Sequence, residues 1–231
     1  MGKSGKQHRK ISEQVDMSKP LDLKSAVEFL QTNSYAKFDE TAELAFRLGV
    51  DPSKSDQGVR GSVALPHGTG KDVRIVVFAS GEAADAAREA GATEVGFMEL
   101  VEKVKEGWTD FDVAIATAEA MQEVRKLGKV LGPRGLMPNP RTGTVTEDTG
   151  SAVKQFKAGR VEFRMDRNAN LAIPFGKLSF SVDQLLENAR AAIAAVVAAR
   201  PGSAKGVYIK RFAMSSTMGV GLSIDGKELP S

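Results

Sequence analysis

The hydrophobic pattern of this chain changes its period twice, and this change limits the folds that the chain can adopt. In residues 42–48 and 59–65, apolar residues alternate with polar ones, which is typical of strands with one buried face. In residues 73–127, continuous apolar runs alternate with helical segments, which is typical of a small parallel α/β layer. At Gly159 the alternating pattern returns. The sequence therefore predicts the α/β class, with an outer α+β part built on an antiparallel sheet and a parallel α/β part between its halves.

This order of segments indicates one domain inserted into another. We expect residues 1–66 and 159–231 to form a discontinuous outer domain, and residues 67–158 to form the inserted domain. Within the outer domain, residues 1–20 are expected to form a flexible basic arm. Insertion at an exposed loop is well tolerated, because the chain ends there lie close together.

Three glycines stand at the two crossings between the domains: Gly68, Gly70 and Gly159. Glycine adopts backbone conformations that a side chain resists, so these residues are interpreted as a double-stranded hinge. Residues 68–71 (GTGK) also suggest a phosphate-binding loop. That segment precedes its strand, however, and an aspartate follows Lys71 where the phosphate-loop motif requires serine or threonine. A hinge is the better interpretation.

Local signals predict several elements of the outer domain. Apolar residues at helical spacing predict a helix over residues 23–30, with Asp22 as its N-cap. The strands at 42–48 and 59–65 are expected to pair with each other in antiparallel fashion. A long helix is expected over residues 181–199, because a Pro-Gly pair follows shortly after it.

The scarce residue types exclude several function classes. The chain has no cysteine and two histidines, which excludes disulfides, thiolate metal sites and a cysteine nucleophile and leaves little for a histidine base. No apolar run approaches the roughly 20 residues of a membrane span. The basic N-terminus lacks the apolar core of a secretory signal. We expect a cytoplasmic protein that is not an enzyme, with no membrane association, no cofactor and no metal.

Charge is distributed unevenly along the chain, although the net charge is only +3. Residues 82–112 hold nine acids and three bases, whereas residues 129–164 hold seven bases and three acids. Such asymmetry suggests one side that binds a polyanion and a separate acidic module. Solvated surface charge of both signs is the simpler alternative, and the sequence leaves it open.

Residues 128–143 (GKVLGPRGLMPNPRTG) contain four glycines and three prolines, which disfavour both helix and central strand. The three cations of this segment are Lys129, Arg134 and Arg141, and no acid occurs in residues 126–146. We therefore expect a stiff, basic, irregular loop that attracts RNA or phosphate. A surface connection with incidental charge remains the alternative.

Two further segments carry candidate binding residues. In residues 36–43 (AKFDETAE), Lys37 and Thr41 are expected on one strand face, and Phe38 is either a core residue or an aromatic ring that packs on nucleotides. In residues 214–219 (MSSTMG), three hydroxyls and a glycine suit ribose and phosphate contacts. An ordinary hairpin turn is the alternative for this second segment.

A nucleotide-dependent enzyme is the second function class that a parallel layer allows. It would require a phosphate-binding loop after the first strand of the insert, where residues 79–81 read Ala-Ser-Gly without a G-x-G-x-x-G motif. The sequence therefore favours an RNA-binding protein over an enzyme.

Five motifs occur in register along the chain: AKFDET, SDQGVRGSVALPHGTGK, GPRGLMPNP, FKAGRVEFRMD and SSTMG. In this order and spacing they closely resemble the L1 family of bacterial large-subunit ribosomal proteins, over most of the chain. The resemblance implies a discontinuous first domain with helices on one face of an antiparallel sheet, and an inserted Rossmann-like domain. It also implies a component of the large subunit, monomeric within the ribosome, that binds large-subunit ribosomal RNA and forms the mobile stalk at the tRNA exit site.

The resemblance implies further partners and the residues that contact RNA. The partners are deacylated tRNA, whose release the stalk assists, and the chain's own operon mRNA, which a translational repressor of this kind binds. By position, the principal RNA contacts are Lys37, Phe38, Thr41, Ser216, Thr217, Met218 and Gly219. Glu28, Arg164 and Asp166 would lie at or beside that surface, and Lys129, Arg134 and Arg141 would form a secondary RNA contact.

Overall fold

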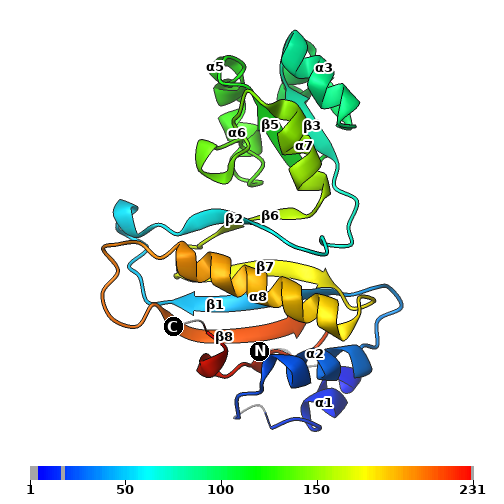
Figure 1. Ribbon diagram of the computed structural model, residues 1–231, viewed down its shortest axis with the longest axis vertical. Coiled ribbons are helices and arrows are strands. Elements are labelled where there is room, and N and C mark those ends of the chain that lie inside the picture. The colour runs from blue at the N-terminus through cyan, green and yellow to red at the C-terminus, as the bar shows by residue number, and fades with distance from the viewer. Residues whose placement is uncertain (1–4, 17–18, 230–231) are drawn as a thin grey trace. The chain divides into compact units, whose positions relative to one another are not determined.

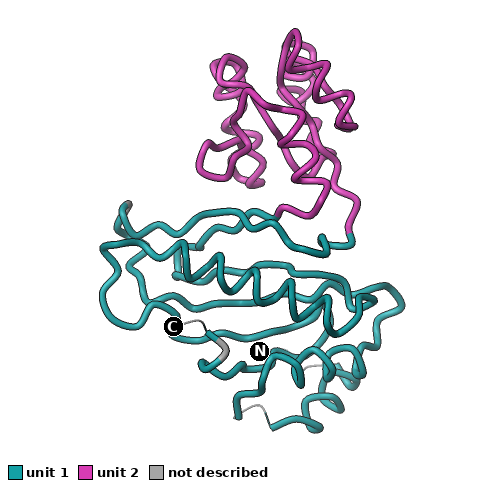
Figure 2. Tube along the Cα trace, in the orientation of Figure 1, with its two compact units in different colours: residues 1–70, 161–231 teal, residues 71–160 magenta. Residues whose placement is uncertain are grey.

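The computed structural model describes residues 5–16 and 19–229, and the chain divides into two compact units (Figure 2). Unit 1 comprises Met1–Gly70 with Val161–Ser231, and unit 2 comprises Lys71–Arg160. The limits of these units fall at 70/71 and 160/161, beside the limits expected from the sequence at 66/67 and 158/159.

Unit 1 is built on a four-stranded antiparallel sheet with the strand order β7-β1-β8-β9 (Figure 1). The strands are β1 (Thr41–Leu48), β7 (Asn170–Lys177), β8 (Ile209–Ser216) and β9 (Leu222–Ser223). Side chains of β1 alternate between buried and exposed, as the period-two pattern predicts. Helix α8 (Val182–Ala198) lies along one face of the sheet, and α2 (Leu23–Thr32) packs beside α8.

The core of unit 1 forms between this sheet face and the helices. Its members include Phe46 and Phe212 of neighbouring strands, whose rings stack with centroids 5.4 Å apart. Helix α2 begins directly after its predicted N-cap, and α8 begins at Val182, one residue after the expected start. The Asp22 side chain accepts a hydrogen bond from the Ser25 N–H, and Ser181 forms a capping box with Gln184.

The strand pairing expected in unit 1 is wrong. Strand β2 (Arg60–Ala64) pairs with β6 (Arg160–Arg164) rather than with β1, because β7 and β8 occupy both edges of β1. Within the segment expected to be a flexible basic arm, residues Lys6–Ser12 form helix α1, and Ile11 of this helix is buried in the core of unit 1. Residues 1–4 and 17–18 of that arm lie outside the described residues.

Unit 2 contains a three-stranded parallel sheet with β3 at its centre, in the order β4-β3-β5. All four residues of β3 (Ile75–Phe78) are buried, because apolar clusters cover both faces of the sheet. The other elements are β4 (Glu94–Gly96), β5 (Val113–Ala116), α3 (Glu82–Glu89), α4 (Met98–Lys105), α5 (Met121–Val124), α6 (Gly128–Leu131) and α7 (Thr149–Lys157). The α/β class expected from the sequence is confirmed.

Short 3-10 turns complete the two units. They are η1 (Ser55–Gln57), η2 (Arg125–Leu127), η3 (Pro140–Thr142) and η4 (Gly226–Glu228). Across the described part of the chain, no helix is both long and apolar enough to cross a membrane.

The basic segment 128–143 is less irregular than its composition predicts. Its first four residues form α6, because α5, η2 and α6 follow one another without a break, and the first proline comes only at position 133. The remainder is anchored by two buried threonines. Thr142 Oγ1 donates to the Asn139 carbonyl at 3.0 Å, and Thr144 Oγ1 accepts from the Asn139 N–H at 2.8 Å.

Asn188 of α8 is fully buried and ties the 65–70 segment to the core of unit 1. Its side chain accepts from the His67 N–H at 3.0 Å and donates to the carbonyls of Gly68 and Phe175 at 2.9 and 2.8 Å. We predict that Asn188→Leu lowers the free energy of unfolding of unit 1 by about 3 kcal/mol, because buried polar groups lose their partners.

Urea denaturation of the full chain measures this loss. Glu187→Ala is the matched control. Glu187 is the residue before Asn188 on α8, and its substitution removes only an exposed contact to His67. Equal losses in the two variants would show that Asn188 does not anchor the segment.

Candidate nucleic-acid interface

A buried carboxylate joins two segments that are far apart in sequence. Glu40 lies just before β1, and only 1% of its surface is exposed. Its Oε1 accepts from Ser34 Oγ at 2.9 Å and from the Ala36 N–H at 3.3 Å. Its Oε2 accepts from Ser216 Oγ at 2.6 Å and from the Met218 N–H at 3.0 Å. One carboxylate oxygen therefore serves each segment.

These donors determine the charge state of Glu40. Burial alone would raise the pKa of the carboxyl group, because it disfavours the charged form. The hydrogen bonds from Ser216, Met218, Ser34 and Ala36 outweigh burial, and together they hold the pKa of Glu40 below its ordinary value. Glu40 is therefore a carboxylate at neutral pH.

Further hydrogen bonds hold the same two segments together. The Thr217 N–H donates to the Thr41 carbonyl at 3.1 Å, and Thr217 Oγ1 accepts from the Thr41 N–H at 3.0 Å. The Tyr35 hydroxyl donates to the Met218 carbonyl at 2.9 Å. Lys177 Nζ donates to Thr41 Oγ1 at 2.9 Å and to the Asp39 carbonyl at 3.0 Å. The segment 34–41 and the hairpin 216–219 thus form one surface at the Thr41 end of the sheet.

The outer side of this surface combines apolar side chains with a cation. Phe38 is 55% exposed, Met218 is 47% exposed and Tyr35 is 37% exposed. Lys37, which precedes Phe38 in the sequence, is also exposed. The core alternative for Phe38 is thus excluded. The strand begins only at Thr41, so the expectation that Lys37 lies on a strand face is wrong.

Gly219 closes the hairpin through a close approach that a side chain would prevent. A Cβ atom at this position would lie 2.3 Å from Ser216 Oγ, the hydroxyl that donates to Glu40. A larger residue at Gly219 would therefore displace the Ser216 side chain from the carboxylate.

The structure brings together most of the predicted contact residues but not all of them. Lys37, Phe38, Thr41, Ser216, Thr217, Met218 and Gly219 belong to the surface just described. Glu28 lies on the exposed side of α2, with its carboxylate 3.9 Å from Lys24 Nζ.

Asp166 lies at the opposite end of the sheet, beside Asn170 of β7, and Arg164 is the last residue of β6 in the separate two-stranded sheet. The Asp166 carboxylate accepts from the Asn168 and Asn170 N–H groups, each at 2.8 Å, and the Asn170 bond is the main reason that its pKa lies below its usual range. Asn170 pairs with Arg47, whereas Thr41 pairs with Lys177. Thr41 and Arg47 are six residue steps apart on β1, which corresponds to about 20 Å.

Sequence reasoning missed Glu40 and Tyr35. A signal for Glu40 was present, because the alternation of Ala42, Leu44 and Phe46 places position 40 on the buried face when it is extended backwards. An acid at such a position requires hydrogen-bond donors, which the sequence does not locate. No sequence signal indicated Tyr35.

In unit 2, all three cations of the basic segment are exposed. Lys129 lies on α6 and Arg141 on η3, while Arg134 donates to the Thr109 hydroxyl. The first strand of this unit leads into α3, whose first turn carries Glu82 and Asp85. Negative charge at a helix N-terminus opposes phosphate binding, so this turn does not favour a nucleotide site.

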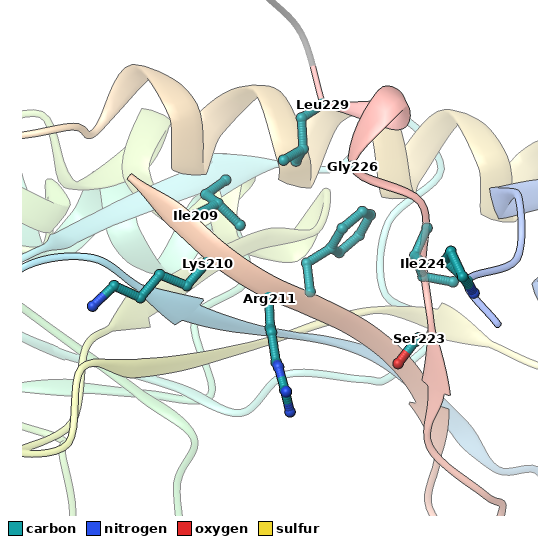
Figure 3. A pocket seen from close by; sticks show the side chains of 9 residues that line it. Ile209, Lys210, Arg211, Ser223, Ile224, Gly226 and Leu229 are labelled. Carbon is teal, nitrogen blue, oxygen red and sulfur yellow. The ribbon is translucent and has the colours of Figure 1, made fainter. Parts of the chain in front are cut away.

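A hollow of about 440 Å³ lies beside β8 at the end opposite Ser216 (Figure 3). Apolar side chains from β8 and the C-terminal segment contribute to its wall, among them Ile209, Ile224 and Leu229. Lys210 and Arg211 also border it. None of the predicted contact residues lines this hollow, so it is not part of the candidate interface.

Comparisons with known proteins agree with the resemblance seen in the motifs. Residues 30–220 match the model of the family described as the ribosomal protein L1p/L10e family. The large ribosomal subunit protein uL1 of Limosilactobacillus reuteri subsp. reuteri (strain JCM 1112) is 52% identical over 223 residues, which cover 96% of this chain and 97% of that relative.

The buried carboxylate makes a pH-dependent contribution to stability. Because the folded-state pKa of Glu40 lies below its ordinary value of 4.5, this contribution is present above about pH 4.5 and is lost as pH falls through the folded-state pKa. We predict that Glu40→Gln lowers the free energy of unfolding at pH 7, and that the gap between the variant and the unmodified chain narrows on acidification.

Urea denaturation of both proteins between pH 7 and acid measures this gap. Other acids with lowered pKa values, such as Asp22 and Asp166, contribute equally to both proteins and cancel in the difference. A gap that stays constant with pH would contradict the charged, hydrogen-bonded state assigned to Glu40.

Proposed function

Because the chain belongs to the ribosomal protein L1p/L10e family, we propose that it is a component of the large ribosomal subunit that binds large-subunit ribosomal RNA. The observation that carries the choice of site is the surface joined through Glu40, where Lys37, Phe38 and Met218 are exposed side chains. We propose that this surface is the principal RNA contact. No reaction is assigned to it, and the chain acts by binding.

The chemistry of this surface suits a folded RNA with unpaired bases. The Lys37 ammonium group is available to a phosphate, and its binding would release counterions. Phe38 and Met218 offer apolar surface on which bases and riboses pack. Thr41 Oγ1 accepts from Lys177, which leaves its own hydrogen free to donate to a phosphate or a ribose.

Two further groups would extend the contact. Asp166 lies beside Asn170, about 20 Å from Thr41 along the sheet, a distance that one folded RNA segment spans, and Arg164 precedes Asp166 by two residues. In unit 2, the exposed cations Lys129, Arg134 and Arg141 are proposed as a secondary RNA contact, since they offer positive charge without a neighbouring acid in sequence.

We further propose the cellular role that the family resemblance implies. The protein would act in the cytoplasm, as a single copy within the ribosome, and form the mobile stalk at the tRNA exit site. The stalk would assist release of deacylated tRNA. The same surface would bind the chain's own operon mRNA and repress its translation.

One prediction of the proposed function concerns the RNA contact. We expect Lys37→Ala to weaken binding to ribosomal RNA and to reduce the slope of log affinity against log salt by about 1, because one phosphate contact is lost. We expect Phe38→Ala to cost about 1–3 kcal/mol of binding free energy through lost stacking. Filter binding to a bacterial large-subunit ribosomal RNA transcribed in vitro, and to the leader of the chain's own mRNA, measures both effects.

Matched controls come from unit 2. Lys105→Ala removes an exposed cation from α4, and Met98→Ala removes an apolar side chain that is 47% exposed. Wild-type affinity in Lys37→Ala and Phe38→Ala, or equal losses in these controls, would exclude the proposed surface. Loss of ribosomal RNA binding with intact mRNA binding would exclude a shared site for repression.

Another prediction of the proposed function concerns motion at the proposed hinge. Gly68, Gly70 and Gly159 have positive φ angles of 69°, 69° and 108°. At Gly70, a Cβ atom would also lie 2.9 Å from side-chain atoms of Lys177 and Phe180, so alanine there would disturb unit 1 itself. We therefore choose Gly68→Ala and Gly159→Ala, and we expect both to narrow the range of distances between the units and to slow release of deacylated tRNA.

Spin labels on single cysteines placed at Lys24 and Lys105 measure those distances, since the chain has no cysteine of its own. Gly202→Ala is the control, because that glycine is exposed and a Cβ atom there would meet nothing beyond its chain neighbours within 4 Å. One narrow distance in the unmodified free protein, unchanged by RNA, would exclude the hinge.

A further inference from the structure

We propose that Glu40 is the positioning residue of the RNA interface: its buried carboxylate fixes the segment 34–38 and the hairpin 216–219 in the arrangement that RNA recognises. This inference rests on the proposed function of the surface. Glu40 itself is 1% exposed and has no surface to offer to RNA. It acts through the groups that it holds.

This inference rests on the observation that each carboxylate oxygen of Glu40 accepts hydrogen bonds from a different segment. Oε1 receives both of its hydrogen bonds from Ser34 and Ala36, on the side that leads to Lys37 and Phe38. Oε2 receives both of its hydrogen bonds from Ser216 and Met218, in the hairpin. One planar group therefore contacts both of the segments that carry the exposed Lys37, Phe38 and Met218. It acts together with the hydrogen bonds of Thr41 to Thr217 and of Tyr35 to Met218.

Position 40 requires a carboxylate because four hydrogen-bond donors surround the side chain, two at each oxygen. Glutamine has one acceptor oxygen, and its NH₂ group would face one of the two donor pairs. A serine hydroxyl can rotate to accept a hydrogen bond from that NH₂ group, but the backbone N–H of Ala36 or Met218 cannot. Aspartate is one methylene shorter, so its carboxylate would retreat from donors that lie 2.6 to 3.3 Å away in the native protein.

No cation neutralises this carboxylate among the ion pairs of the described residues. The four donors take the place of its hydration shell, and each one is therefore needed.

This geometry also assigns a role to Ser216. Its side chain is buried at 5% exposure, and its hydroxyl donates to Glu40 at 2.6 Å. Its hydrogen is thus already used within the protein. Ser216 serves the interface by completing the hydrogen-bond shell of Glu40, whereas Thr217 and Met218 are exposed and would contact the RNA under the proposed function.

Three measurements on the full chain test the inference: urea denaturation, affinity for an in vitro transcript of bacterial large-subunit ribosomal RNA at several salt concentrations, and amide hydrogen exchange of Ala36 and Met218 in the free protein. The variants are Glu40→Gln, Ser34→Ala and Ser216→Ala. Glu43→Gln is the matched control, since Glu43 is an exposed acid on β1 whose carboxylate receives one long hydrogen bond, 3.3 Å from Ser215 Oγ.

We expect Glu40→Gln to remain folded, to exchange the Ala36 or Met218 amide faster, and to bind the transcript about tenfold to a hundredfold more weakly. The salt slope should match that of the unmodified chain, because no phosphate contact is removed. Ser34→Ala and Ser216→Ala should weaken binding less, and Glu43→Gln should bind as the unmodified chain does.

A folded Glu40→Gln variant that binds the transcript with unchanged affinity would overturn the inference. Should Glu40→Gln fail to fold, unchanged affinity in both serine variants would overturn it instead. The proposed function fails by a separate criterion, namely unchanged affinity in Lys37→Ala and Phe38→Ala. Weakened binding in those two variants together with normal binding in Glu40→Gln rejects the role of Glu40 alone.

Discussion

The pairing of β1 on both of its edges is the constraint on which unit 1 depends. β7 and β8 flank β1, so the sheet draws its strands from both halves of a discontinuous sequence. The register of these pairs places Ala42 opposite Ser216 and Thr41 opposite Lys177. The residues just before β1 and just after β8 therefore meet at the same end of the sheet. The candidate interface follows from that register, because its two segments extend directly from paired strands.

Elements that depend on local chemistry were predictable from the sequence, and partners that depend on long-range pairing were not. The N-cap Asp22, the long helix near residues 181–199 and the alternation along β1 were predicted from neighbouring residues. The partner of β2 could not be read in this way, since the pattern of a half-buried strand does not identify which edge it joins. Helix α6 was missed for a different reason, because glycine lowers helix propensity but continuity with the preceding helical turns overrides it.

The interface shows the same limit at the scale of single side chains. Alternation extended back from Ala42 places both Phe38 and Glu40 on the inner face, yet only Glu40 is buried. The regular strand begins at Thr41, and Phe38, which precedes the strand, is exposed to solvent. Glu40 stays inside because four donors replace its contact with water, and two of these donors come from residues 216 and 218. A partner so distant in sequence leaves no local signal, so the position of Glu40 was readable but its compensation was not.

The distance in sequence between Glu40 and Met218 has a consequence for the synthesis of the protein. The two residues that share a hydrogen bond are separated by 178 positions, in a chain of 231 residues. A nascent chain that has not yet reached the hairpin possesses Lys37 and Phe38 but lacks Ser216 and Met218, which donate to Glu40 Oε2. The surface is assembled only when residues 216–219 have been translated and both halves of unit 1 have come together. Under the proposed function, a fragment that ends before residue 216 would lack the hairpin and could not present the complete RNA surface.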